Sequence, residues 1–80
     1  MALYSVKTKL SLEDVMAKAN AFFAGQLGLE VTEPEPCCVS FLGGGGYVTV
    51  RVSNERKPTE VELETREWDH HVRQFMHEIA

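Results

Sequence analysis

The chain has 80 residues, of which 44% are apolar and 25% charged, and its formal net charge is −4 at pH 7. This length supports one hydrophobic core, so we expect a single α+β domain over residues 1–80 rather than a disordered chain. Twelve acidic residues outnumber eight basic ones, and because nucleic-acid binding needs basic side chains that displace counterions from phosphates, we expect no nucleic-acid partner.

The first ten residues predict little by themselves. Residues 3–9 alternate weakly between apolar and polar types, which indicates either an edge strand or a loose arm over residues 1–10. The N-terminus lacks the apolar core of a signal peptide, and the apolar runs of the chain are far shorter than a membrane span. We therefore expect a cytoplasmic protein with no membrane partner.

A first helix is expected over residues 11–27. Ser11 and Asp14 have the spacing of a capping box, and apolar residues follow at helical intervals. Gly28 stands where a glycine in the left-handed conformation commonly ends a helix.

Alternating apolar residues then predict strands. We expect residues 29–32 to open a strand that Pro34 and Pro36 interrupt at a sheet edge, and that resumes over 37–42. Four glycines, Gly43 to Gly46, separate it from a second alternating run at 47–53, which predicts a β-hairpin. After a polar loop, a third strand is expected over 59–66 and a second helix over 68–79.

The loop lengths also predict the register of these strands. Between the first two strands of the meander we expect the pairs Leu42–Tyr47, Phe41–Val48 and Val39–Val50. Between the second and third we expect Val50–Leu63, Val52–Val61 and Arg51–Glu62. We expect a two-layer α-β-β-β-α fold, in which a three-stranded antiparallel meander, with an extra N-terminal edge strand if residues 1–10 supply one, carries both helices on one face. The expected core comprises Phe22, Phe23, Val39, Phe41, Val48, Val50, Val61, Leu63, Trp68, Val72, Phe75 and Met76. The outer face should carry Cys38, Ser40, Leu42, Tyr47, Thr49, Arg51, Glu60, Glu62, Glu64 and Arg66.

This element order resembles that of the double-stranded RNA-binding domain over residues 11–80. The resemblance implies a fold but not the activity, because the family holds phosphates with lysines at the start of its second helix, where this chain has Glu67-Trp68-Asp69-His70-His71. The segments Gly43-Gly44-Gly45-Gly46-Tyr47-Val48 and Arg66-Glu67-Trp68-Asp69 are also similar to a small uncharacterised prokaryotic family, which implies no activity.

The two cysteines are adjacent, and neighbouring residues of a strand point to opposite faces. We therefore expect reduced thiols, with Cys37 packed as a small apolar side chain beside Val39 and Phe41. A zinc site would need ligands paired at suitable spacing, and a nucleophilic Cys38 would need a histidine on its own face of the sheet. Neither is expected from His70, His71 and His77, so we expect no catalytic residue, no metal and no cofactor.

The glycines are the one unusual motif, since a turn needs fewer than four and each extra glycine costs about 0.5–1 kcal/mol relative to alanine. The first interpretation is a hairpin tip or a close backbone contact. The alternative is contact with a partner or ligand through Gly43, Gly44, Gly45, Gly46, Tyr47, Cys38 and Arg51.

Two features of the expected sheet point to association. Leu42 and Tyr47 among charged residues suit a moderately polar interface, and open sheet edges invite pairing. We expect a non-enzymatic cytoplasmic interaction module that forms a homodimer or binds an unknown protein partner. The alternatives are a small-ligand or enzymatic site at a subunit interface near the glycine loop, and nucleic-acid binding by analogy of fold.

Overall fold

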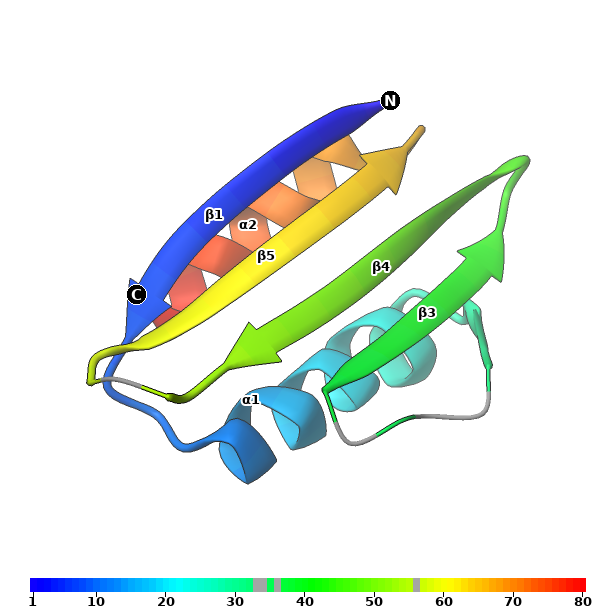
Figure 1. Ribbon diagram of the computed structural model, residues 1–80. Helices are drawn as coiled ribbons and strands as arrows, with labels where there is room; N and C mark the ends of the chain where they lie inside the picture. The colour runs from blue at the N-terminus through cyan, green and yellow to red at the C-terminus, as the bar shows by residue number, and fades with distance from the viewer. Residues whose placement is uncertain (33–34, 36, 56) are drawn as a thin grey trace.

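Five antiparallel strands form one sheet, and two helical segments cover one of its faces, in the computed structural model (Figure 1). The structure describes residues 1–32, 35, 37–55 and 57–80. The strand order across the sheet is β1-β5-β4-β3-β2. The strands are β1 (Ala2–Thr8), β2 (Glu30–Val31), β3 (Cys38–Gly43), β4 (Gly46–Ser53) and β5 (Thr59–Arg66).

The central three strands have the register that the loop lengths predict. Leu42 pairs with Tyr47 and Val39 with Val50 between β3 and β4, and Arg51 pairs with Glu62 between β4 and β5. Because side chains alternate between faces along a strand, this register places the buried apolar side chains of all three strands on the same side, while Leu42 faces the other way.

The sheet is wider than the predicted three-stranded meander. β1 pairs with β5 along its whole length, from Ala2 opposite Thr65 to Thr8 opposite Thr59, so the N-terminal segment is an edge strand and not a loose arm. At the other edge β2 pairs antiparallel with β3. The chain therefore reverses between them, and the prediction of one interrupted strand over 29–42 is wrong. Pro34 and Pro36, to which we assigned the interruption, lie outside the described residues, as does Arg56 of the polar loop.

The first helix begins as predicted but changes geometry halfway. The Ser11 hydroxyl accepts a hydrogen bond from the Asp14 amide at 3.1 Å and caps α1 (Leu12–Ala19). The segment continues as the π-helix η1 (Asn20–Gln26), in which two consecutive side chains, Phe22 and Phe23, are buried. Gly28, with φ of +73°, ends the segment as expected. Within the described ranges, no helix is long and apolar enough to cross a membrane.

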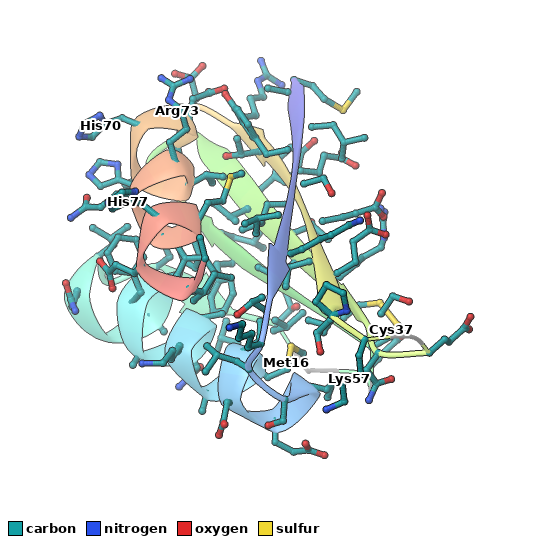
Figure 2. The ribbon with its side chains drawn as sticks, turned by 90° about the vertical axis from the view of Figure 1, so that its left-hand side faces the viewer. Met16, Cys37, Lys57, His70, Arg73 and His77 are labelled. Carbon is teal, nitrogen blue, oxygen red and sulfur yellow. A yellow bond between two sulfur atoms is a disulfide. The ribbon has the colours of Figure 1, made fainter. Side chains whose placement is uncertain are left out.

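The second helix, α2 (Asp69–Ile79), packs beneath β5 and β1, while α1 packs beneath β4. Both helical segments lie on the same side of the sheet and leave the opposite face open (Figures 1 and 2). The predicted core is buried except for Trp68 and Met76, which are partly buried against it. The buried core also contains the apolar side chains Val15, Ala19, Leu29, Val52 and Ile79.

Candidate functional site: the open face of the sheet

The open face of the sheet presents the outward side chains of four long strands. Alternation along β1 sends Leu3, Ser5 and Lys7 outward, since Tyr4 and Val6 pack against the core on the helix side. The other strands add the residues predicted for this face, which are exposed or half-buried. Those residues are Cys38, Ser40, Leu42, Tyr47, Thr49, Arg51, Glu60, Glu62, Glu64 and Arg66.

Exposed apolar side chains lie toward one end of this face, with the charged residues Arg66 and Glu64 of β5 between those of β1 and those of β3 and β4. Met1, Leu3 and Leu42 are 89%, 63% and 46% exposed, and Tyr47, directly opposite Leu42, is half-buried. These four residues, which we call the apolar patch, lie at the end of the face next to the glycine loop. The contributions of Met1 and Leu3 were missed because the weak alternation of residues 3–9 left β1 unassigned as a strand.

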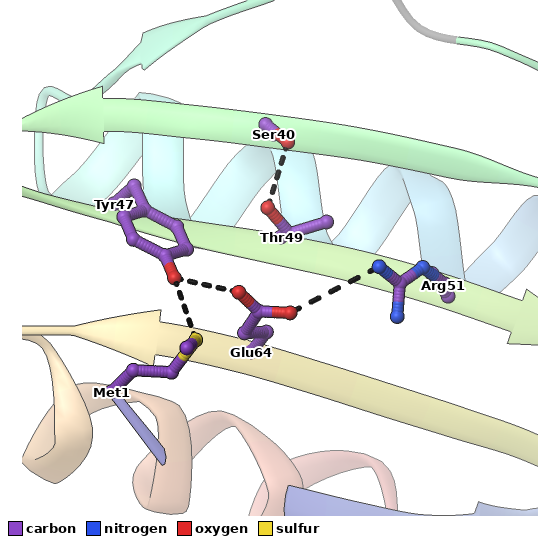
Figure 3. Close-up of polar contacts among 6 residues, drawn as sticks. All are labelled: Met1, Ser40, Tyr47, Thr49, Arg51 and Glu64. Atoms are coloured by element: carbon purple, nitrogen blue, oxygen red, sulfur yellow. Dashed lines mark hydrogen bonds and ion pairs between the residues drawn. The ribbon is translucent and has the colours of Figure 1, made fainter. Parts of the chain in front are cut away.

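Polar contacts join the apolar patch to the middle of the face (Figure 3). The Tyr47 hydroxyl donates to Glu64 Oε2 at 2.6 Å and lies 3.4 Å from the sulfur of Met1. Arg51 Nη2 lies 3.9 Å from the other oxygen of the same carboxylate. The hydrogen bond to Glu64 is the main cause that raises the pKa of Tyr47 above its usual value of 10, with partial burial and the carboxylate charge adding to it. Glu64 is thus held by two partners rather than solvated freely.

The glycine loop is explained by contacts within the chain. Gly44 and Gly45 have φ values of +59° and +79°, which disfavour any other residue. A Cβ on Gly43 would lie 2.6 Å from Cδ2 of Leu29, and one on Gly46 would lie 2.0 Å from the carbonyl oxygen of Arg66. Glycine is therefore favoured at positions 44 and 45 by the turn and at position 46 by a neighbouring backbone oxygen, whereas a Cβ on Gly43 would meet the end of the flexible Leu29 side chain.

The seven predicted site residues fall into two separate groups. Cys38 and Arg51 are directly opposite each other near one end of the β3–β4 pair. The four glycines and Tyr47 are at the other end, about 16 Å away along the strand at roughly 3.3 Å per residue. A single site that unites the glycine loop with Cys38 is therefore not formed, although the Arg51 side chain reaches the carboxylate that Tyr47 contacts.

The cysteines are joined in a disulfide, so the expectation of two reduced thiols is wrong for this structure. The face alternation used for that expectation applies within a strand, but β3 begins only at Cys38. Cys37 lies before the strand and is exposed, not packed beside Val39 and Phe41.

The histidines do not join the cysteines in a common site. His70 and His77 lie on the side of α2 that faces away from the sheet, and Cys37 lies at the far end of the sheet (Figure 2). In the part of the chain that the structure describes, no group of three or more His, Cys, Asp or Glu side chains is arranged to hold a metal ion.

Comparison with known proteins adds no family to these observations. No protein-family model matches the sequence, and no curated protein matches it either. The apolar patch on an uncovered sheet face remains the feature that the packing of this domain does not itself explain.

Proposed function

We propose that this protein is a non-enzymatic interaction module that binds a second copy of itself through the open face of its sheet. The observation that carries the proposal is the apolar patch, in which Met1, Leu3 and Leu42 expose between 46% and 89% of their surface. A second copy offers the same patch, so a twofold arrangement would bury both at once.

An open sheet face alone would not support this proposal, because antiparallel sheets commonly have one solvated face. Such a face normally carries polar side chains, as the middle of this one does with Ser5, Arg51 and Glu62. Isolated exposed apolar residues are also ordinary. What favours an interface is that Leu42 lies directly opposite Tyr47 and that the Met1 sulfur lies 3.4 Å from the Tyr47 hydroxyl, which is already satisfied by Glu64.

The charges on the same face suit a twofold contact. Glu60, Glu62 and Glu64 form an acidic row on β5, while Arg51 and Arg66 supply positive charge beside it. Two identical faces related by a twofold axis can place the acidic row of one copy near the basic residues of the other. The polar residues would then form the rim around the apolar patch.

The size of the face predicts weak association. A standard interface involves roughly 20–30 residues and about 800 Å² from each partner, and the open face offers fewer outward side chains than that. We expect a dissociation constant of about 1–100 μM, which corresponds to a binding free energy of about 5–8 kcal/mol.

Sedimentation velocity over a range of protein concentrations tests the proposal with two matched variants. Leu42 and Val31 are 46% and 43% exposed, but Val31 pairs with the inward-facing Phe41 and belongs to the helix side of the sheet. Leu42→Lys should weaken self-association at least tenfold, because an ammonium group would be buried at the contact. Val31→Lys should leave it unchanged.

The same experiment separates the alternatives. A wild-type chain that remains monomeric at millimolar concentration would contradict self-association. Association that survives both Leu42→Lys and Leu3→Lys, two substitutions within the apolar patch, would contradict the face as the contact.

A further inference from the structure

We propose that the Cys37–Cys38 disulfide exchanges reversibly with low-molecular-weight thiols, and that the two cysteines alternate between disulfide and dithiol while the domain stays folded. The chain has no other cysteine, and the bond joins residues that are adjacent in sequence. The site lies at the opposite end of β3 from the apolar patch, so it is independent of the contact proposed above.

This disulfide contributes little to the stability of the fold. A disulfide stabilises a protein mainly by closing a loop in the unfolded chain, and the effect grows with the length of that loop. Here the sequence separation is 1, so the bond closes a ring that restricts only the two cysteines themselves and joins no distant segments of the chain. The loss of this bond should therefore cost the fold little.

The backbone at the cysteines is held by other contacts. The Val52 amide donates to the Cys37 carbonyl at 2.9 Å, the Glu35 amide donates to the Cys38 carbonyl at 2.8 Å, and the Cys38 amide donates to the Glu35 carbonyl at 3.2 Å. These hydrogen bonds involve no sulfur atom, so they can persist after the disulfide opens. The dithiol form should consequently keep the same fold.

The surroundings of the bond give a thiol access to one sulfur. Cys37 is exposed and Cys38 is half-buried, and Cys37 lies at the outer end of the sheet (Figure 2). Two hollows, of about 180 and 360 Å³, both include Cys37 in their lining, and the smaller one also includes Cys38. Because exchange requires a thiolate to reach a disulfide sulfur, attack is expected at Cys37, the more exposed residue of the pair, with Cys38 as the leaving group.

The exchange transfers two electrons from two external thiols to the Cys37–Cys38 disulfide. An incoming thiolate attacks the Cys37 sulfur and forms a mixed disulfide, the Cys37–Cys38 bond breaks, and Cys38 leaves as a thiolate that takes a proton from water. A second thiolate attacks the sulfur of the bound thiol, which releases Cys37 as a thiolate and frees the external disulfide. Two external thiols are oxidised and the two cysteines are reduced. In the reverse direction, Cys38 attacks the mixed disulfide and restores the original bond.

The charges near the bond predict which thiols react fastest. Among the residues that the structure describes, the charged side chains that line the two hollows are Arg51, Glu55, Glu60 and Glu62. Arg51 also lies 3.9 Å from a carboxylate oxygen of Glu64, which offsets its charge. The excess of carboxylates favours the approach of a cationic aminothiol over an anionic thiol.

Intact-mass measurement after alkylation tests the proposal, because every labelled thiol must come from this pair. Oxidised protein treated with cysteamine under native conditions should gain two alkyl groups, and its Tm should change by less than about 5 °C. At low ionic strength the rate per thiolate should be roughly 3–10-fold higher for cysteamine than for 3-mercaptopropionate. In about 0.5 M salt this ratio should approach one, because the charges are then screened.

Two single variants test which sulfur reacts. Both Cys37→Ser and Cys38→Ser should fold like the wild type, and the free Cys37 thiol of Cys38→Ser should react with cystamine faster than the free Cys38 thiol of Cys37→Ser. The proposal is overturned if the thiols become available only after denaturation, or if reduction lowers the Tm by more than about 10 °C. It is also overturned if the cationic and anionic thiols react at equal rates at low salt, or if Cys38 is the faster thiol.

Discussion

The indole Nε1 of Trp68 donates a hydrogen bond to the carbonyl oxygen of Gly43 at 2.9 Å. This bond joins the start of α2 to the tip of the β3–β4 hairpin, two segments that are 25 residues apart in sequence. The ring also lies against the glycine loop, since a Cβ on Gly44 would be 2.8 Å from Cζ2 of Trp68. The glycines therefore serve to admit a tryptophan and a neighbouring strand end.

Alanine substitutions in the glycine loop should destabilise the fold in a defined order. Gly46→Ala should cost most, about 3 kcal/mol or more, because its Cβ would lie 2.0 Å from the rigid carbonyl of Arg66. Gly44→Ala should cost about 1–3 kcal/mol through its positive φ and the Trp68 ring. Gly45→Ala should cost about 1 kcal/mol, since only its φ of +79° is unfavourable. Urea unfolding measures the free energy of unfolding of each variant. Equal losses in the three variants would show that these contacts do not determine the stability of the loop.

A substitution to glycine should have the opposite effect at Glu67. This residue has a φ of +79° although it is not a glycine, and its side chain is exposed. Glu67→Gly should relieve the unfavourable conformation and leave stability unchanged or raise it by up to about 1 kcal/mol. Urea unfolding beside the exposed control Glu13→Gly, where glycine enters the first turn of α1, should show a loss only in the control. A clear loss in Glu67→Gly would mean that its side chain makes a contact that matters.

The two tyrosines should titrate above their usual range. A hydrogen bond to Asp69 is the main cause that raises the pKa of Tyr4, and Glu64 has the same effect on the pKa of Tyr47. Because the chain has only these two tyrosines, the phenolate absorbance of the folded protein should rise at higher pH than that of the unfolded protein.

The same shifts predict a loss of stability in alkali. The folded state favours the neutral phenols, so they add to the free energy of unfolding. This stabilisation is fully present below the unfolded pKa of about 10 and is lost as the pH rises through the higher folded pKa. Thermal unfolding between about pH 8 and 11 should therefore show a smaller fall for the double variant Tyr4→Phe/Tyr47→Phe than for the wild type. Identical titration of folded and unfolded protein would contradict both hydrogen bonds.

Substitutions in the aromatic core should destabilise the domain strongly. Phe75 is 1% exposed, and its ring centroid lies 5.2 Å from that of Phe23 and 5.9 Å from that of Phe22. Phe75→Ala should cost about 3–5 kcal/mol, a large part of the roughly 4–12 kcal/mol available to a domain of this size. Phe75→Leu, which keeps most of the volume, should cost less than half as much in the same denaturation experiment. A loss below about 1 kcal/mol for Phe75→Ala would contradict the packing.

Local patterns in the sequence were sufficient to predict the central strands and the first helical segment. The four glycines determine the pairing of Leu42 with Tyr47, and the rest of the β3–β4 register follows from it. In the structure Gly43 pairs with Gly46, so the turn itself is the two residues 44–45. Ser11 and Gly28 likewise mark the two ends of the first helical segment through local hydrogen bonds and backbone conformation. Each of these features depends on residues that are close together in the chain.

Features that depend on distant residues were missed. The pairing of Ala2 with Thr65 joins the two ends of the chain, and no loop length specifies it. The same pairing brings Met1 and Leu3 to the open face, so the apolar patch could not be predicted from the sequence. The glycines were recognised as unusual, but the atoms that a Cβ there would meet, in Leu29, Arg66 and Trp68, lie outside the loop. Cys37 was misplaced because the strand begins one residue later than expected.

The most direct test of the proposed self-association is a concentration series of amide and methyl NMR spectra of the wild-type protein. From about 10 μM to 1 mM, a range that spans the expected dissociation constant, the signals of Leu3, Leu42 and Tyr47 should shift together along one binding curve. Signals from the exposed side of α2, such as those of His70 and His77, should not move. Spectra that stay the same across this range, or shifts confined to the helices, would contradict the account.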